Sequence, residues 1–282
     1  MIEKYYNGVI EQVAGGIGNV EHNSILVRYS NDFSIWDLES VNHYKDQTDI
    51  FFTCHEFSYN KIAEAYEPYL GLIRQMFHKY CSGTLEEFME ECDVYKLQRP
   101  VFESYFEKGF CERTEQILID EVEYEQERMH SSIVTMLQKL SEICPIVIVL
   151  NRFQLASKST MQLTNRLLQT KNKNIGIVLG VNDVQSIPEF AHEEWDAICE
   201  SMDDRNMVYH IGNAGRNMEP DVMDYYSDYE SDDGYRKLNN LVYFLDFDQA
   251  DHHLSKIERR IKFDNFTISE KKHYQLLLLQ IM

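Results

Sequence analysis

The sequence predicts an α/β protein with a parallel sheet and a helical C-terminal part. Two apolar runs, at 146–150 and 174–180, show no alternation of polar and apolar positions. A strand of this kind is buried on both faces, as in the centre of a parallel sheet. Predicted helices separate these runs from the other predicted strands, and strands that alternate with helices are typical of a parallel α/β fold.

Short apolar runs predict the strands, and apolar residues at helical spacing predict the helices. Gly15, Gly16 and Gly18 end the first helix, and Pro145 ends the longest one. Thr84 begins a further helix, because Thr84 and Glu87 have the spacing of a capping box. The predicted strands span 24–28, 49–54, 146–150, 174–180 and 207–211, and the predicted helices span 2–13, 34–44, 60–80, 114–142, 159–170, 238–262 and 268–282.

Three segments follow from this pattern. Residues 1–215 are expected to form the α/β domain. Seven acidic residues between Glu219 and Asp233 predict an exposed acidic loop over 216–235. Residues 236–282 are expected to form a helical subdomain. Its last helix is crowded with leucines and carries no cap, which is typical of a helix covered by a further segment and suggests a truncated relative of a longer protein.

The composition excludes two classes of partner. The chain has 282 residues, of which 44% are hydrophobic and 12% aromatic, so it can fill a core. Asp and Glu number 47 and Lys and Arg 27, which gives a formal net charge of −20. Phosphate-rich nucleic acids and anionic membrane surfaces would repel such a chain. We therefore expect no nucleic-acid partner and no membrane partner.

The lack of a signal-peptide pattern and the spacing of the cysteines favour a cytoplasmic location. The N-terminus has no cationic segment followed by a long apolar one, as a signal peptide has. No stretch approaches the roughly 18 apolar residues of a membrane span. The six cysteines are scattered and form no CxxC pair, so we expect free thiols rather than a zinc or redox site.

The segment that begins at Pro145 carries a resemblance to a known family. A proline, five aliphatic residues and the pattern that follows resemble the Walker B region of STAND-type AAA ATPases of signal-transduction regulators, an origin-recognition-like AAA domain. In this register Asn151 takes the position of the magnesium-coordinating aspartate, and Arg152 takes that of the water-activating acid. Gln154 and Ala156 match the family pattern, whereas Ser157 replaces its aspartate.

Other segments support the same resemblance over roughly residues 1–215. The strand near 175–181, followed by Asn182, is similar to the sensor strand of the family. His55-Glu56 after the second strand, and Pro68-Tyr69 at the start of a helix, also resemble it. The resemblance implies a three-layer, P-loop NTPase-like parallel sheet. It also implies helical repeats and an output domain that lie outside this module.

The phosphate-binding loop of the family is degenerate here. Where GxxxxGK[ST] should follow the first strand, Tyr29 and Ser34 replace the glycines, Ile35 replaces the lysine and Trp36 replaces the magnesium-binding hydroxyl residue. Phosphoryl transfer depends on positioning and on cations that neutralise the phosphate oxygens. A second glycine-rich stretch, 15–18, follows a helix and has no adjacent lysine, so it is interpreted as a turn.

The family's functional residues are replaced in both the Walker A and the Walker B segment. This coincidence predicts a pseudo-ATPase, which is a non-catalytic regulatory or protein-interaction module without cofactor or catalytic metal. Its expected partner is a protein or a missing C-terminal repeat or output domain. Two alternatives stay open. The chain could be a weak adenine-nucleotide switch that retains ATP and Mg²⁺ without efficient hydrolysis. It could also be a helical scaffold fragment of a larger repeat-containing regulator.

Overall fold

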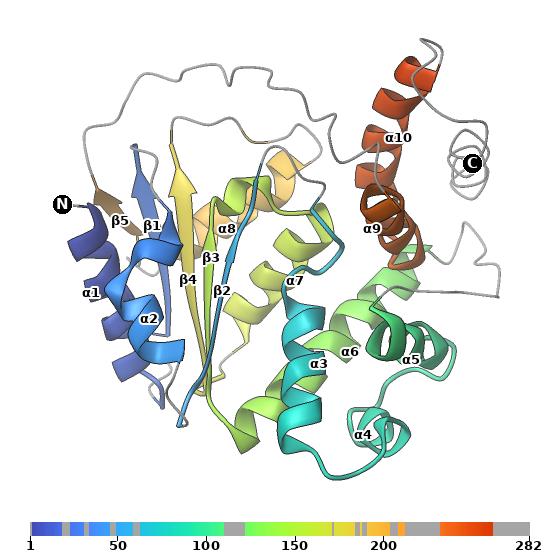
Figure 1. The fold of residues 1–282 in the computed structure, drawn as a ribbon, viewed down its shortest axis with the longest axis horizontal. Helices are drawn as coiled ribbons and strands as arrows, with labels where there is room; N and C mark the ends of the chain where they lie inside the picture. Colours follow the sequence, from blue (N-terminus) through green and yellow to red (C-terminus); the bar gives the residue numbers. More distant parts are fainter. Residues whose placement is uncertain are drawn as a thin grey trace.

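Five parallel strands form one sheet in the order β2-β3-β4-β1-β5 (Figure 1). The computed structural model describes residues 2–18, 23–30, 34–45, 49–58, 63–109, 122–170, 172–183, 187, 191–203, 208–211 and 232–261. The strands are β1 (Ser24–Tyr29), β2 (Phe51–Glu56), β3 (Ile146–Asn151), β4 (Ile175–Asn182) and β5 (Val208–Ile211). All five predicted strands are therefore present. β3 and β4 are buried along their whole length, as the absence of alternation predicted.

Helices cover both faces of the sheet, which confirms the predicted three-layer α/β fold. One face carries α1 (Ile2–Gly15) and α2 (Glu39–Lys45), and the other carries α3 (Tyr69–Tyr80), α6 (Val122–Ile143), α7 (Lys158–Gln169) and α8 (His192–Asp203) (Figure 1). Successive residues of a strand point to opposite faces. Accordingly Ile146, Ile148 and Leu150 join the core under α3, α6 and α7, whereas Val147 and Val149 join the core under α1 and α2.

The C-terminal part is helical and shares the larger core. The remaining helices are α4 (Leu85–Glu91), α5 (Arg99–Lys108), α9 (Asp232–Tyr243) and α10 (Phe247–Ile261). Leu238, Phe244 and Leu254 belong to the same buried cluster as the strand residues of β3. The Phe244 ring also packs edge-on against Tyr66 at 5.6 Å between centroids. Hydrophobic burial thus joins α9 and α10 to the α/β part.

Two local signals act as the sequence predicted. The Thr84 hydroxyl accepts from the Glu87 backbone N–H, and the Glu87 carboxylate accepts from the Thr84 backbone N–H, so the capping box is complete. These contacts lower the pKa of Glu87 from its usual value. Pro68 stands at the N-cap of α3, directly before Tyr69.

Three predicted helices differ from the structure. The predicted helix at 34–44 is broken, because Leu38 is extended between the short 3-10 turn η2 (Ile35–Asp37) and α2. The predicted helix at 60–80 begins only at Tyr69, because proline at 68 lacks an N–H and disfavours helical backbone before it. The predicted helix at 238–262 is two helices, separated where Leu245 takes a positive φ of 66°.

Some helices were not predicted, and some predicted segments lie outside the residues that the structure describes. Helices α5 and α8 were not predicted. Most of the predicted acidic loop, the predicted helix at 268–282 and the start of the predicted helix at 114–142 lie outside the described residues. Within the described part of the chain, no helix is long and apolar enough to cross a membrane. The described cysteines are free thiols.

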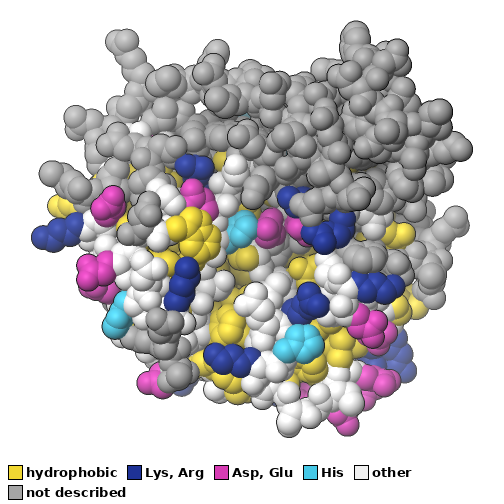
Figure 2. Space-filling model, in the orientation of Figure 1, with side chains coloured by type: hydrophobic (Ala, Val, Ile, Leu, Met, Phe, Trp, Pro, Cys, Tyr) yellow, Lys and Arg dark blue, Asp and Glu magenta, His cyan; other side chains and the backbone are white. Residues whose placement is uncertain are grey.

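Acidic and basic side chains both occur on the described surface. Figure 2 shows Lys and Arg side chains next to Asp and Glu side chains over much of the face it presents. Arg99 pairs with Glu90 at 3.1 Å, and Arg28 pairs with Asp183 at 3.2 Å. Pairs of this kind offset part of the net negative charge locally.

The N-terminus of α7 is capped from the C-terminal helices. The first N–H groups of a helix have no partner within it. Here the Lys158 N–H donates to Gln249 Oε1 at 3.1 Å, and the Ser159 N–H donates to Asp246 Oδ2 at 2.9 Å. The Thr160 N–H donates to the Ser157 hydroxyl at 3.1 Å. Three backbone donors of α7 are therefore satisfied, two of them by the C-terminal part.

Asp246 gives a pH-dependent test of this junction. Asp246 is buried, and burial raises the pKa of its carboxyl above the usual value. As the pH rises above that usual value, the unfolded chain ionises first, so the wild type loses stability until the folded pKa is passed. Asp246→Asn keeps an acceptor for Ser159, so its stability relative to wild type should rise over this window and then stay constant.

Urea unfolding between pH 4 and pH 8 measures this difference. Asp246→Ala, which removes the acceptor, should instead be less stable than Asp246→Asn by about 1 kcal/mol. A difference between wild type and Asp246→Asn that does not change with pH would contradict the assignment.

Candidate functional site

The carboxyl edge of the sheet brings together residues that lie far apart in the sequence. Tyr29 at the end of β1 pairs in register with Asn182 at the end of β4. Asn151 at the end of β3 pairs in register with Glu56 at the end of β2. Because the strands are parallel and β4 lies between β1 and β3, the two segments to which the resemblance assigns the Walker motifs meet at this one edge. The topology of the sheet thus gathers the predicted site.

Asn151 is held in a fully buried tyrosine cluster. The Tyr29 hydroxyl donates to Asn151 Oδ1 at 2.7 Å, and the Tyr6 ring of α1 lies edge-on to Tyr29 at 6.5 Å between centroids. All three residues are completely buried. Burial, with the nearby Tyr29 and Glu56, raises the pKa of Tyr6 well above its usual value, so its hydroxyl stays neutral. Aromatic side chains therefore fill the space beside the position that the resemblance assigns to magnesium.

Gly180 on β4 allows this cluster to form. A Cβ atom at Gly180 would lie 2.2 Å from the Tyr6 hydroxyl oxygen and 2.6 Å from Asn151 Oδ1. Both distances are far below van der Waals contact, and the contacted groups are buried. Only glycine fits at this position of the strand.

A carboxylate of the chain bridges the two Walker-like segments. Glu56 Oε2 accepts from the Ile35 backbone N–H at 3.2 Å. Glu56 Oε1 lies 3.5 Å from Nη1 of Arg152. The Glu56 and Arg152 side chains are only 14% and 20% exposed, so solvent screens this contact weakly. In P-loop proteins backbone N–H groups and a cationic side chain hold a phosphate, whereas here they hold a glutamate.

Arg152 has a backbone conformation that suits this contact. Its φ of 52° and ψ of 40° are left-handed, which is uncommon outside glycine. The turn places Arg152 immediately before the short 3-10 helix η4 (Phe153–Leu155), which is buried. The chain therefore holds a strained arginine at the edge where its guanidinium reaches Glu56.

The side chains of the other predicted site residues have different surroundings. Ile35 is fully buried in the core under α1 and α2. The Ser34 hydroxyl caps η2 by accepting from the Trp36 N–H. Trp36 is 46% exposed and lies under the Lys45 ammonium at 4.7 Å from the ring centroid. Asn182 is buried, and its carbonyl accepts from Gln154 Nε2 at 3.5 Å. Trp36 thus lies outside the Asn151 cluster.

The glycine-rich stretch at 15–18 forms a turn. Gly18, whose φ is 96°, donates its N–H to the Lys173 carbonyl at 2.7 Å. Lys173 lies two residues before Ile175, where β4 begins, at the edge of the sheet opposite to the Asn151 cluster. The geometry agrees with the predicted turn.

Two residues of the site had no role in the sequence-based prediction. Glu56 was noted only as part of a resemblance, and Tyr6 was placed only within a helix. Glu56 at the end of β2 could have been paired with Arg152 only with the strand order known, because β2 and β3 are separated by about 90 residues of sequence. Nothing in the local pattern around Tyr6 indicates its contact with β4.

Two comparisons with known proteins give no match. No protein-family model matches the chain, and no curated protein matches it. Among the described residues, no group of three or more His, Cys, Asp and Glu side chains could hold a metal ion. The geometry of the carboxyl edge is therefore the basis for the function proposed below.

Removal of one hydroxyl tests the buried cluster. Tyr29→Phe leaves Asn151 Oδ1 buried without its 2.7 Å donor, and an unsatisfied buried acceptor costs about 1–3 kcal/mol. Tyr209→Phe is the matched control, because Tyr209 is 40% exposed on the edge strand β5, and exposed positions change stability by about 0.5 kcal/mol or less. Urea unfolding measures both, and equal stability of Tyr29→Phe and wild type would disprove the buried hydrogen bond.

Proposed function

We propose that this chain is a non-catalytic regulatory or protein-interaction module, a pseudo-ATPase related to STAND-type AAA ATPases of signal transduction. The observation that carries the proposal is the Glu56 carboxylate, which bridges the Ile35 N–H and the Arg152 guanidinium. The chain's own anion takes the contacts that a phosphate would need.

Electrostatics at this edge disfavour ATP. A nucleotide phosphate would have to displace the Glu56 carboxylate or share Arg152 with it, and two like charges in one partly buried site repel each other strongly. The lysine that would offset this repulsion is replaced by Ile35, which is fully buried. Phosphoryl transfer relies on cationic neutralisation, and the residues that would supply it are replaced.

Sterics support the same proposal. Tyr6, Tyr29 and Asn151 are completely buried against one another. A magnesium–phosphate group at Asn151 would require this packed cluster to open, and cluster formation already satisfies the Asn151 oxygen. The strand order adds support, because it sets the sensor-like strand β4 between the two Walker-like strands.

The remaining role is transmission of a signal by contact. A protein partner, or a repeat or output segment of a longer protein, would receive it, and we place the module in the cytoplasm. The large negative charge favours partners other than polyanions.

Isothermal titration calorimetry with ATP tests the proposal. Wild type should show no binding to ATP, with or without Mg²⁺, up to millimolar concentrations, because Glu56 and the tyrosine cluster occupy the edge. Micromolar, magnesium-dependent binding would overturn the proposal and favour the nucleotide switch.

A matched variant separates the two causes of exclusion. Glu56→Ala frees the Ile35 N–H and Arg152 while it leaves Tyr6 and Tyr29 in place. Weak millimolar binding of ATP by this variant alone would identify the carboxylate as the excluding group. Continued absence of binding would identify the buried cluster as sufficient, and circular dichroism shows whether the variant remains folded.

A further inference from the structure

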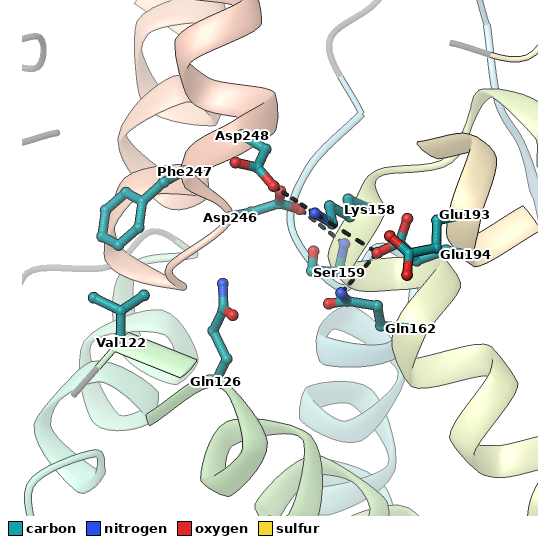
Figure 3. Close-up of a pocket in the computed structure, with 10 residues that line it drawn as sticks. All are labelled: Val122, Gln126, Lys158, Ser159, Gln162, Glu193, Glu194, Asp246, Phe247 and Asp248. Atoms are coloured by element: carbon teal, nitrogen blue, oxygen red, sulfur yellow. Dashed lines mark hydrogen bonds and ion pairs between the residues drawn. The ribbon is translucent and has the colours of Figure 1, made fainter. Parts of the chain in front are cut away.

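A long groove lies beside α7, on the face of the sheet away from α1 and α2. It consists of two adjoining cavities, of about 460 Å³ and 630 Å³. Gln126, Gln162, Glu193 and Glu194 line both cavities, so the two are continuous. We call the combined space the α7 groove. Figure 3 shows its first cavity, enclosed by side chains from α6, α7, α8 and the start of α10.

The first cavity is strongly acidic. In Figure 3 the Lys158 ammonium extends between Asp248 on one side and Glu194 on the other. It pairs with Asp248 and lies 3.7 Å from Glu194 Oε1. Glu193 and Asp246 add two further carboxyl groups. Even without Asp246, whose pKa burial raises, three carboxylates face one ammonium. This imbalance favours a cationic ligand.

Two buried polar atoms in the groove need a hydrogen-bond partner. Glu194 Oε1 accepts from Gln162 at 2.9 Å, but the buried Glu194 Oε2 has no hydrogen bond within the described residues. His130, which lines the second cavity, is only 7% exposed, and its buried Nε2 has none there either. Buried polar groups in proteins are nearly always hydrogen-bonded. Both atoms therefore indicate a missing interaction.

An N–H donor suits the Glu194 oxygen, and it suits His130 Nε2 in the tautomer that carries its proton on Nδ1. Burial lowers the pKa of His130 to about 4, so its ring is neutral near pH 7 and presents one acceptor nitrogen. An ionised carboxylate oxygen can only accept. Val122 and Phe247 line the first cavity with apolar surface that suits methylene groups. Each cavity has the volume of a typical small-molecule site.

We propose that the α7 groove binds an organic polyamine, with one ammonium group at Glu194 and Glu193 and its methylene chain along the groove toward His130. A polyamine supplies N–H donors and a positive charge for the acidic first cavity. In the second cavity the lining is almost entirely polar, and the cationic Arg166 there is paired with Glu127. A bare metal ion fits less well, because the described residues hold no cluster of three metal-ligating side chains. The site is separate from the Asn151 cluster and does not depend on the proposed pseudo-ATPase role.

Calorimetric titration of the full chain with spermidine at physiological salt tests the proposal. Wild type should bind spermidine saturably, with one molecule per chain. Glu194→Gln should weaken binding about tenfold or more, because it removes a charge-assisted contact. Glu200→Gln is the matched control, since Glu200 is exposed on the same helix α8 and does not line the groove. It should bind as wild type does.

The alternatives give distinct outcomes. Equal loss in Glu194→Gln and Glu200→Gln, or binding that does not saturate, would show only general attraction to an acidic protein and overturn the proposal. Binding of a lysine-rich peptide without binding of spermidine would overturn it in favour of a protein partner. If Glu194→Gln does not fold, Glu193→Gln at an exposed position provides the second variant, and it should also weaken spermidine binding relative to Glu200→Gln.

Discussion

The parallel pairing of β2, β3, β4 and β1 is the constraint on which the rest of the molecule depends. Because all strands run the same way, their last residues meet at one edge. The pairing of Glu56 with Asn151, and of Tyr29 with Asn182, sets which side chains share that edge. Burial of β3 and β4 on both faces makes this register costly to change, since a shift by one residue would turn every side chain to the other face and disrupt the packing of both cores.

The edge so formed engages several of its own polar groups. An open phosphate site keeps backbone N–H groups and a cation ready for a ligand. Here the Ile35 N–H and Arg152 are already engaged by Glu56, and the Asn151 oxygen is engaged by Tyr29. Contacts of this kind stabilise the fold and weaken the driving force for binding an anion at this edge.

Helix α7 connects the C-terminal part of the chain with the α7 groove. Its N-terminus follows the arginine turn after β3 and is capped by Asp246 and Gln249 from the C-terminal part. Its exposed flank, together with α6 and α8, forms the acidic groove. The same helix therefore touches the carboxyl edge, the C-terminal helices and the groove, and its amino end is fixed by contacts that are distant in sequence.

Local pattern in the sequence determined the doubly buried strands β3 and β4 and the capping box at Thr84, and composition determined the net charge. The strands and the capping box depend on neighbours within a few residues, so periodicity and capping rules suffice to predict them. Only the tertiary structure decided the strand order, the contact of Glu56 with Arg152, the approach of Tyr6 to Gly180 and the outward position of Trp36. The tertiary structure also decided where the predicted helices at 34–44 and 238–262 are interrupted, at Leu38 and Leu245. These features arise from packing between distant segments, which no local pattern encodes.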